Sequence, residues 1–192
     1  MRLTQRVHDQ LKAHLRPGDF AVDATAGNGH DSLLLAELVG SSGRVSIIDV
    51  QAAAIDATQK RLHAAGYLEQ AQFHQDNHAT VLAALAKQSP GKASAIVFNL
   101  GYLPGSDKLV QTKAHHTLSA LNASTQLLAP NGLLMVTAYR GHSGGADEAE
   151  SIATWAGEQE ALGWVIKCYD PGCDKVPLPP VLWILTPPTT AP

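Results

Sequence analysis

Residues 18–31 read G-D-F-A-V-D-A-T-A-G-N-G-H-D, which is a short apolar run followed by an aspartate and a loop with two glycines. The run at 20–22 is typical of a buried strand, and the leucines of 32–39 predict a helix directly after the loop. Glycine permits a tight turn and a close approach of backbone to a ligand, and a helix N-terminus directs N–H groups at whatever binds there. The stretch therefore predicts a ligand site at the end of a strand in an α/β fold.

Further apolar runs alternate with helix-length segments along the rest of the chain. The runs lie at Phe20–Val22, Val45–Ile48, Ala71–Phe73, Ala95–Phe98, Leu133–Thr137, Val165–Cys168 and Val181–Leu185. Helices are expected within 1–17 and over 32–39, 52–65, 80–87, 116–128 and 148–162. The first five runs lack clean alternation, as strands buried on both faces do, and a Pro/Gly-rich turn joins the last two. We predict the class I methyltransferase (Rossmann-like) variant of the α/β class: a mostly parallel seven-stranded sheet, helices on both faces and a C-terminal antiparallel hairpin.

The composition fits one globular domain over residues 1–186 with a short tail at 187–192. Hydrophobic residues make up 45% of the 192 residues, and the net charge of -3 argues against a strongly basic nucleic-acid binder. No apolar run reaches the length of a membrane span, and the N-terminal segment lacks the apolar core of a signal peptide. We therefore expect a cytoplasmic protein without membrane contact. Its two cysteines, Cys168 and Cys173, are expected to be reduced.

Acidic residues end the first three apolar runs, where the carboxyl ends of parallel strands would meet. The spacing D-x-x-x-G-x-G from Asp23 favours S-adenosylmethionine (SAM), whose ammonium a carboxylate can meet; a dinucleotide fingerprint would need a glycine in place of Ser32. Asp49 lies at the offset that suits the ribose hydroxyls, and Asp76 is a candidate partner of the adenine amine. Each of the last two could instead cap the helix that follows.

Residues 99–105, N-L-G-Y-L-P-G, follow the fourth run and resemble the N-P-P-Y box of amino-group methyltransferases. Methyl transfer to nitrogen requires a neutral amine whose lone pair points at the methyl carbon. The side-chain oxygen of Asn99 and a nearby backbone carbonyl can hold the amine hydrogens and so aim that lone pair. Tyr102 could pack on a base. The alternative is a structural loop led by Asn99, with Tyr102 in the core.

Residues 138–145, A-Y-R-G-H-S-G-G, follow the fifth run and are typical of a substrate-side loop. His142 could take the proton that the amine loses, because the pKa of histidine lies near neutrality, although many histidines are plain surface residues. Further cations could meet phosphates or simply form a solvated face: Arg140, Lys108, Lys113, His115 and His116.

Five features of the chain resemble, in order, the motifs of the MnmM (YtqB-like) methyltransferases, which were formerly labelled rRNA methylases. They are DATAGNGHDS, IDVQ, FNLGYLPGSDK, the pair Thr112 and Thr117, and YRGHSGGADE. The resemblance spans residues 4–186. It implies a class I fold, a homodimer, and SAM-dependent methylation of 5-aminomethyl-(2-thio)uridine at the wobble position of the tRNA anticodon. The family often has an asparagine before the P-P pair near the C-terminal hairpin, and this chain departs from that pattern with Gly172, Cys173 and Asp174.

The resemblance also assigns roles to individual residues. It implies a SAM site that consists of Asp23, Thr25, Gly27, Asn28, Gly29, Asp31, Asp49, Gln51, Asp76, His78, Asn99 and Gly101. The residues expected to face the nucleotide are Tyr102, Lys108, Thr112, Tyr139, Arg140 and His142, of which Tyr139 and His142 join Asn99 as catalytic candidates.

Four other functions remain compatible with parts of the sequence. The chain could methylate rRNA or a small-molecule amine, which its acidic net charge mildly favours. It could be a nucleotide-binding module without catalysis or an NAD-linked dehydrogenase. The nine histidines could also build a metal centre, but no metal is expected: His115 and His116 are adjacent and cannot share a site on a helix, and strands separate His30, His74, His78 and His142.

Overall fold

The computed structural model describes residues 2–101, 114–172 and 178–188. The strands are β1 (Phe20–Asp23), β2 (Arg44–Asp49), β3 (Ala71–Gln75), β4 (Ala93–Leu100), β5 (Leu128–Ala138), β6 (Val165–Tyr169) and β7 (Val181–Thr186). The helices are α1 (Leu3–His14), α2 (His30–Val39), α3 (Ala52–Ala65), α4 (His78–Gln88), α5 (Ala114–Leu127) and α6 (Gly145–Ala161), with a short 3-10 helix at Leu68–Gln70.

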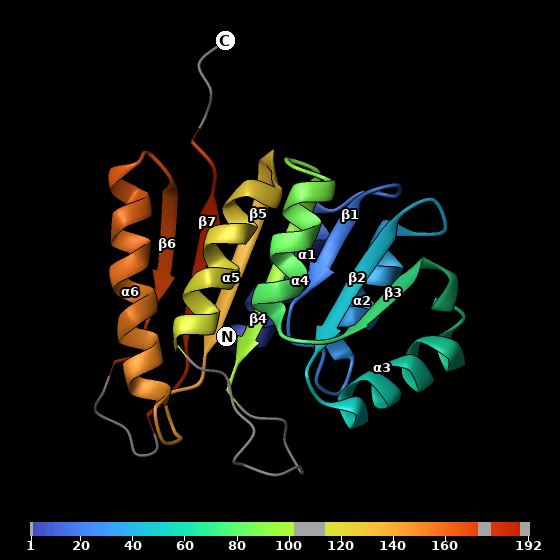
Figure 1. The fold of residues 1–192 in the computed structure, drawn as a ribbon, viewed down its shortest axis with the longest axis horizontal. Helices are drawn as coiled ribbons and strands as arrows, with labels where there is room; N and C mark the ends of the chain where they lie inside the picture. Colours follow the sequence, from blue (N-terminus) through green and yellow to red (C-terminus); the bar gives the residue numbers. More distant parts are fainter. Residues whose placement is uncertain (1, 102–113, 173–177, 189–192) are drawn as a thin grey trace.

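The strands form one sheet in the order β3-β2-β1-β4-β5-β7-β6. Strands β1 to β5 pair in parallel, whereas β7 lies antiparallel to both β5 and β6. The predicted fold, including the C-terminal antiparallel hairpin, is confirmed. The strand order reverses between β1 and β4, and in open α/β sheets ligands bind at this position, beyond the carboxyl ends of the strands. Figure 1 shows the arrowheads of β1, β2 and β4 at one edge of the sheet.

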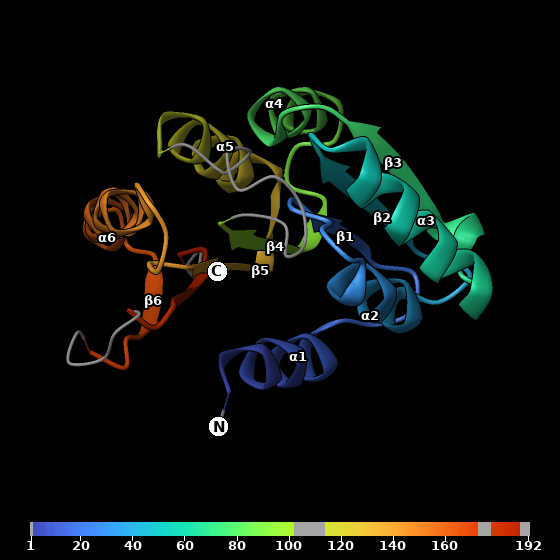
Figure 2. The ribbon, with the colours of Figure 1, turned by 90° about the horizontal axis from the view of Figure 1, so that it is seen from below.

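Helices cover both faces of the sheet, and each layer has its own core. Side chains from α1, α2 and α3 meet strand residues such as Ala21 and Val97 on one face. Side chains from α4, α5 and α6 meet Val22 and Phe98 on the other. Neighbouring strand residues belong to opposite cores because successive side chains point to opposite faces of a strand. Figure 2 shows α1 and α2 on one side of the sheet and α4, α5 and α6 on the other.

The third strand differs from the prediction that the first five strands are buried on both faces. None of the residues in β3 is buried, and Gln72 and Gln75 are exposed. The reason is its place in the sheet: β3 pairs only with β2 and forms one edge. An edge strand has a neighbour on one side alone, so it is covered less completely.

The remaining predictions differ from the structure mainly in the ends of the elements. The strands extend by one to six residues beyond the predicted apolar cores, because backbone pairing continues into polar residues such as Asp23 and Asn99. The predicted tail lies outside the described residues from position 189 onward. Cys173 also lies outside them, so the expected reduced pair remains a prediction, while Cys168 is exposed. In the described part of the chain, no helix is long and apolar enough to cross a membrane.

Candidate active site

Three carboxylates lie close together at the carboxyl ends of β1 and β2 and at the start of α2. Asp23 ends β1, Asp49 ends β2, and Asp31 is the second residue of α2. They interact electrostatically: the charges of both Asp31 and Asp49 raise the pKa of Asp23. Like charges this close favour a cationic ligand, because a positive charge relieves their repulsion. The predicted acidic residues at the ends of β1 and β2 therefore meet in one place.

Asp23 lies beneath the glycine loop and is fully buried. Its carboxylate accepts hydrogen bonds from the Ser32 hydroxyl at 2.5 Å and from the Thr25 backbone N–H at 3.2 Å. Burial is the largest cause that raises its pKa from 3.8 to about 7, and the neighbouring carboxylates add to it. Ser32 was noted in the sequence only as a missing glycine. A polar residue in an otherwise apolar helical stripe was the signal for this contact.

The glycine loop is held in shape by contacts from β2 and α3. Asp49 accepts the backbone N–H of Gly27 at 3.0 Å and that of Gln51 at 2.9 Å, so the end of β2 is tied to the loop. Gly29 has a φ of +75°, and a Cβ there would come within 2.8 Å of the Thr58 backbone on α3. The loop therefore requires glycine at this position both for its conformation and for the close packing of α3.

Asn99 lies at the end of β4, and two hydrogen bonds fix its position. Its backbone N–H donates to the Thr25 hydroxyl at 2.7 Å, and its side-chain amide donates to Asp31 Oδ2 at 2.6 Å. A carboxylate only accepts, so the amide N–H₂ faces Asp31 and the carbonyl Oδ1 is directed elsewhere. The structure therefore brings together four predicted site residues, namely Thr25, Asp31, Asp49 and Asn99, around the glycine loop.

The other oxygen of Asp31 contacts a residue that the sequence analysis did not single out. His8 Nε2, from α1, lies 2.6 Å from Asp31 Oδ1. His8 comes directly after Val7, which belongs to the apolar stripe of α1. This stripe packs on the same sheet face as α2. No sequence signal links positions 8 and 31, because the contact depends on how α1 docks.

The start of α4 forms the part of the site next to β3. His78 is buried and lies edge-on to Phe98, with 5.8 Å between the ring centroids. Burial and the nearby His116 lower its pKa to about 4, so the ring is neutral near pH 7. Asp76 is exposed and accepts the N–H of Asn77 at 2.6 Å, whereas Asn77 caps α4 by accepting from Ala79. The helix-cap alternative is thus realised by Asn77, and the role of Asp76 towards adenine remains a prediction.

The loop after β5 returns to the end of β4. The Tyr139 N–H donates to the Leu100 carbonyl at 2.9 Å, and a Cβ on Gly101 would come within 3.3 Å of Tyr139 Cβ. Burial and the charge of Asp31 raise the pKa of Tyr139. His142 Nδ1 lies 3.0 Å from the Ser143 carbonyl, which places the hydrogen on Nδ1 and makes Nε2 the basic nitrogen.

Arg140, from the same loop, binds the C-terminal hairpin in this structure. Its guanidinium contacts both carboxylate oxygens of Asp170, at 2.7 and 3.2 Å, and the carbonyls of Pro179 and Gly172. These contacts lower the pKa of Asp170. Arg140 therefore anchors the hairpin to β5, and its contact with a nucleotide remains a prediction. Tyr102, Lys108 and Thr112, also predicted on the substrate side, lie outside the described residues.

Three residues at this edge belong to motifs quoted in the sequence analysis, which gave none of them a role of its own. The Thr117 hydroxyl donates to Glu148 Oε1 at 2.6 Å, and both side chains are buried between α5 and α6. Val50 follows Asp49 and is 50% exposed, although it is a large apolar residue. An exposed apolar side chain next to Asp49, the residue predicted to meet the ribose, suits a flat, apolar ligand group.

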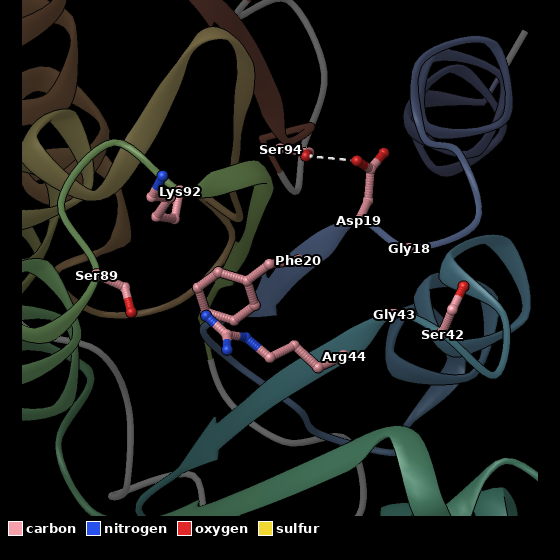
Figure 3. Close-up of a pocket in the computed structure, with 9 residues that line it drawn as sticks. All are labelled: Gly18, Asp19, Phe20, Ser42, Gly43, Arg44, Ser89, Lys92 and Ser94. Carbon is pink, nitrogen blue, oxygen red and sulfur yellow. Dashed lines mark hydrogen bonds between the residues drawn. The ribbon is translucent and has the colours of Figure 1, made fainter.

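A shallow pocket of about 450 Å³ lies at the opposite edge of the sheet, around the amino ends of β1, β2 and β4. Figure 3 shows Arg44 stacked on Phe20 and Ser94 bonded to Asp19 within it. None of the predicted site residues lines this pocket. Among the described residues, no group of three or more His, Cys, Asp or Glu side chains could hold a metal ion.

Comparisons with known proteins identify relatives that are similar in sequence and in fold. Residues 45–185 match the family described as "Putative rRNA methylase". A chloroplastic tRNA (mnm5s2U34)-methyltransferase from Arabidopsis thaliana is 32% identical over 94% of this chain and 68% of its own length. A structure from Clostridium thermocellum, described as a "putative rRNA-methylase", is 31% identical, with a TM-score of 0.89 over 97% of both chains.

A second solved structure was determined with a bound ligand. It is a "putative methyltransferase" from Streptococcus mutans in complex with S-adenosylhomocysteine (SAH), the demethylated form of SAM. It is 29% identical to this chain, with a TM-score of 0.83 over 96% of this chain and 97% of its own.

Substitution of Asp23 by asparagine should change how stability depends on pH. Between pH 4 and 7 the native protein holds a proton on Asp23 that the unfolded chain, with a pKa near 3.8, has released. Asp23 should therefore lower the free energy of unfolding as the pH rises, by up to about 1.4 kcal/mol per pH unit, and this contribution opposes that of His78, whose lowered pKa makes stability rise with pH. Asp23→Asn should lack this contribution, and urea denaturation at several pH values measures both profiles.

The difference between the two profiles isolates Asp23, because other groups such as His78 contribute equally to both. Parallel profiles between pH 4 and 7 would show that the carboxyl group titrates normally.

Proposed function

We propose that this chain, which belongs to the methyltransferase family described as "Putative rRNA methylase", methylates the amino group of 5-aminomethyl-(2-thio)uridine at the wobble position of tRNA. Family membership makes it a SAM-dependent methyltransferase. The substrate rests on the Arabidopsis thaliana relative, whose name specifies that wobble uridine, and on the position of Asn99. The product would be 5-methylaminomethyl-(2-thio)uridine.

The residues at the carboxyl edge of the sheet fit SAM. Asp49 is held by the N–H groups of Gly27 and Gln51 and retains acceptor capacity for two ribose hydroxyls. Val50 offers an apolar surface beside it for adenine. The charge of Asp31, joined by that of Asp23 above pH 7, suits the cationic methionine part of SAM. Because Asp23 is fully buried, the partly exposed Asp31 is the better placed of the two for direct contact.

SAM supplies an electrophilic methyl group on a positively charged sulfur. The reaction forms the N–CH₃ bond as the S–CH₃ bond breaks, so the attacking nitrogen must hold its lone pair in line with that bond. Asn99 Oδ1, turned away from Asp31, can accept a hydrogen from the substrate amine and direct the lone pair. This orientation of Asn99 is the single observation that carries the proposal.

The loop after β5 completes the proposed substrate side. His142, whose Nδ1 lies 3.0 Å from the Ser143 carbonyl, is retained as the candidate acceptor of the proton that the methylated amine loses. Tyr139 is 43% exposed beside Gly101 and can pack on the uridine ring. Tyr102, Lys108, Thr112 and Arg140 are retained as substrate contacts in the proposal. With a net charge of -3, contacts to tRNA phosphates must be local.

The proposal also includes a homodimer and a cytoplasmic location. The edge of the sheet formed by β6 carries two exposed apolar side chains, Leu162 and Val165, which are 70% and 54% exposed. A second copy of the chain would remove this apolar surface from water.

Incubation with labelled SAM tests the substrate. The acceptors are tRNA and rRNA from cells that lack this methylation, with the tRNA carrying the 5-aminomethyl group. Nucleoside analysis should show 5-methylaminomethyl-(2-thio)uridine in the tRNA and no label in rRNA. Label in rRNA alone, or in a small amine alone, would replace the tRNA proposal with the alternative substrate.

Asn99→Ala should lower the rate of methyl transfer at saturating substrates about 100-fold or more, because the amine loses the acceptor that aims its lone pair. The dissociation constant of SAM, measured by calorimetry, should change much less. Asn122→Ala is a matched control, because Asn122 is bonded to Trp155 on the helix layer away from the glycine loop. Wild-type turnover by Asn99→Ala would remove Asn99 from the mechanism.

A further inference from the structure

We propose that His8, on the N-terminal helix α1, is a positioning residue that fixes the direction of Asn99 through Asp31. The inference rests on the proposed function, because it assigns His8 a part in the same methyl transfer. Its basis is a continuous chain of contacts from α1 to the end of β4: His8 Nε2 to Asp31 Oδ1 at 2.6 Å, and Asp31 Oδ2 to Asn99 Nδ2 at 2.6 Å.

Each oxygen of the Asp31 carboxylate has a different partner, His8 on Oδ1 and Asn99 on Oδ2, so His8 can limit how the carboxylate rotates. A carboxylate bonded on one oxygen only can rotate about its Cβ–Cγ bond and move the bonded partner with it. His8 holds the second oxygen and so stops this rotation. Because the Asp31 carboxylate accepts from both sides, Nε2 of His8 carries a hydrogen in this arrangement.

The docking of α1 makes His8 a rigid support. Val7, Leu11 and Leu15 are buried against the sheet face that also carries α2. Only 24% of the His8 side chain and 14% of the Asp31 side chain are exposed, so water competes weakly for the contact. His8 thus reaches the active site from a helix that contributes none of the predicted site residues.

The same helix provides a matched control. His14 Nε2 lies 3.0 Å from the carbonyl of Ser94, at the amino end of β4. Both histidines connect α1 to the body of the protein through one hydrogen bond. Only the contact of His8 leads to Asn99, so the two can be compared directly.

The test uses the full-length chain with four substitutions. His8→Leu removes the donor, and His8→Gln retains an N–H donor that can reach Asp31. His8→Phe keeps the ring without the donor and serves if the leucine variant fails to fold. His14→Leu removes the control contact. Each variant is assayed for kcat and KM with tRNA, for SAM affinity, and for the side-chain amide signals of Asn99 in a ¹H–¹⁵N spectrum, assigned by their loss in Asn99→Ala.

We expect His8→Leu to lower kcat about tenfold with little change in the KM for tRNA, because misdirection of a reacting group affects the chemical step. The Asn99 amide signals should shift or broaden in His8→Leu and His8→Phe. His8→Gln should recover kcat to within about threefold of wild type, since the hydrogen bond to Asp31 is restored. His14→Leu should leave both kcat and the amide signals as in wild type.

Unchanged Asn99 amide signals in both donor-free variants, or an equal loss of kcat in His14→Leu, would overturn the role of His8. Failure of the proposed function is distinguishable from this. If wild-type protein methylates rRNA or a small amine instead of tRNA, the kinetic comparison is made with that acceptor. The amide signals test the link from His8 to Asn99 without any acceptor.

Discussion

The carboxylate of Asp31 is the contact on which the geometry of the site depends. One oxygen holds the Asn99 amide and the other holds His8, so a single side chain connects α1, α2 and the end of β4. Its charge also raises the pKa of Asp23 and of Tyr139, on either side of it. The reversal of strand order between β1 and β4 makes this possible, because it opens the sheet edge where the glycine loop and Asn99 meet. The position of Asn99 is therefore set by an electrostatic network rather than by its own loop alone.

The same network explains why an acidic site suits this chemistry. Carboxylates close together destabilise one another, and burial adds to the cost at Asp23. A cation bound among them would remove part of this cost, so the proposed SAM site would favour the positively charged methyl donor over SAH, which has lost that charge. Exchange of product for a new donor would then be favoured by charge. A net charge of -3 and an acidic centre together require that the proposed tRNA binding rely on local contacts at the rim of the site.

The sequence predicted the fold well because the apolar runs and the helix-length gaps between them follow from local periodicity. It also located Asp49 and Asn99, since polar residues that end apolar strands in a parallel sheet meet at one edge. It did not identify β3 as an exposed edge, because the order of strands in a sheet is not a local property. His8 was missed for the same reason: its contact with Asp31 depends on the docking of α1. The contact of Arg140 with substrate remains a prediction, and the sequence did not indicate the contacts of its guanidinium with the hairpin, because no motif specifies the course of the hairpin in space.

The central claim is that Asp31 acts through Asn99, and a double-mutant cycle tests it most directly. Asp31→Ala, Asn99→Ala and the double variant are compared with wild type in single-turnover methyl transfer at saturating SAM and acceptor. If Asp31 serves to direct Asn99, the double variant should be no slower than the slower single variant, because removal of Asn99 leaves nothing to direct. If the two losses multiply, the side chains act independently, and the network from α1 to β4 does not set the direction of the amide.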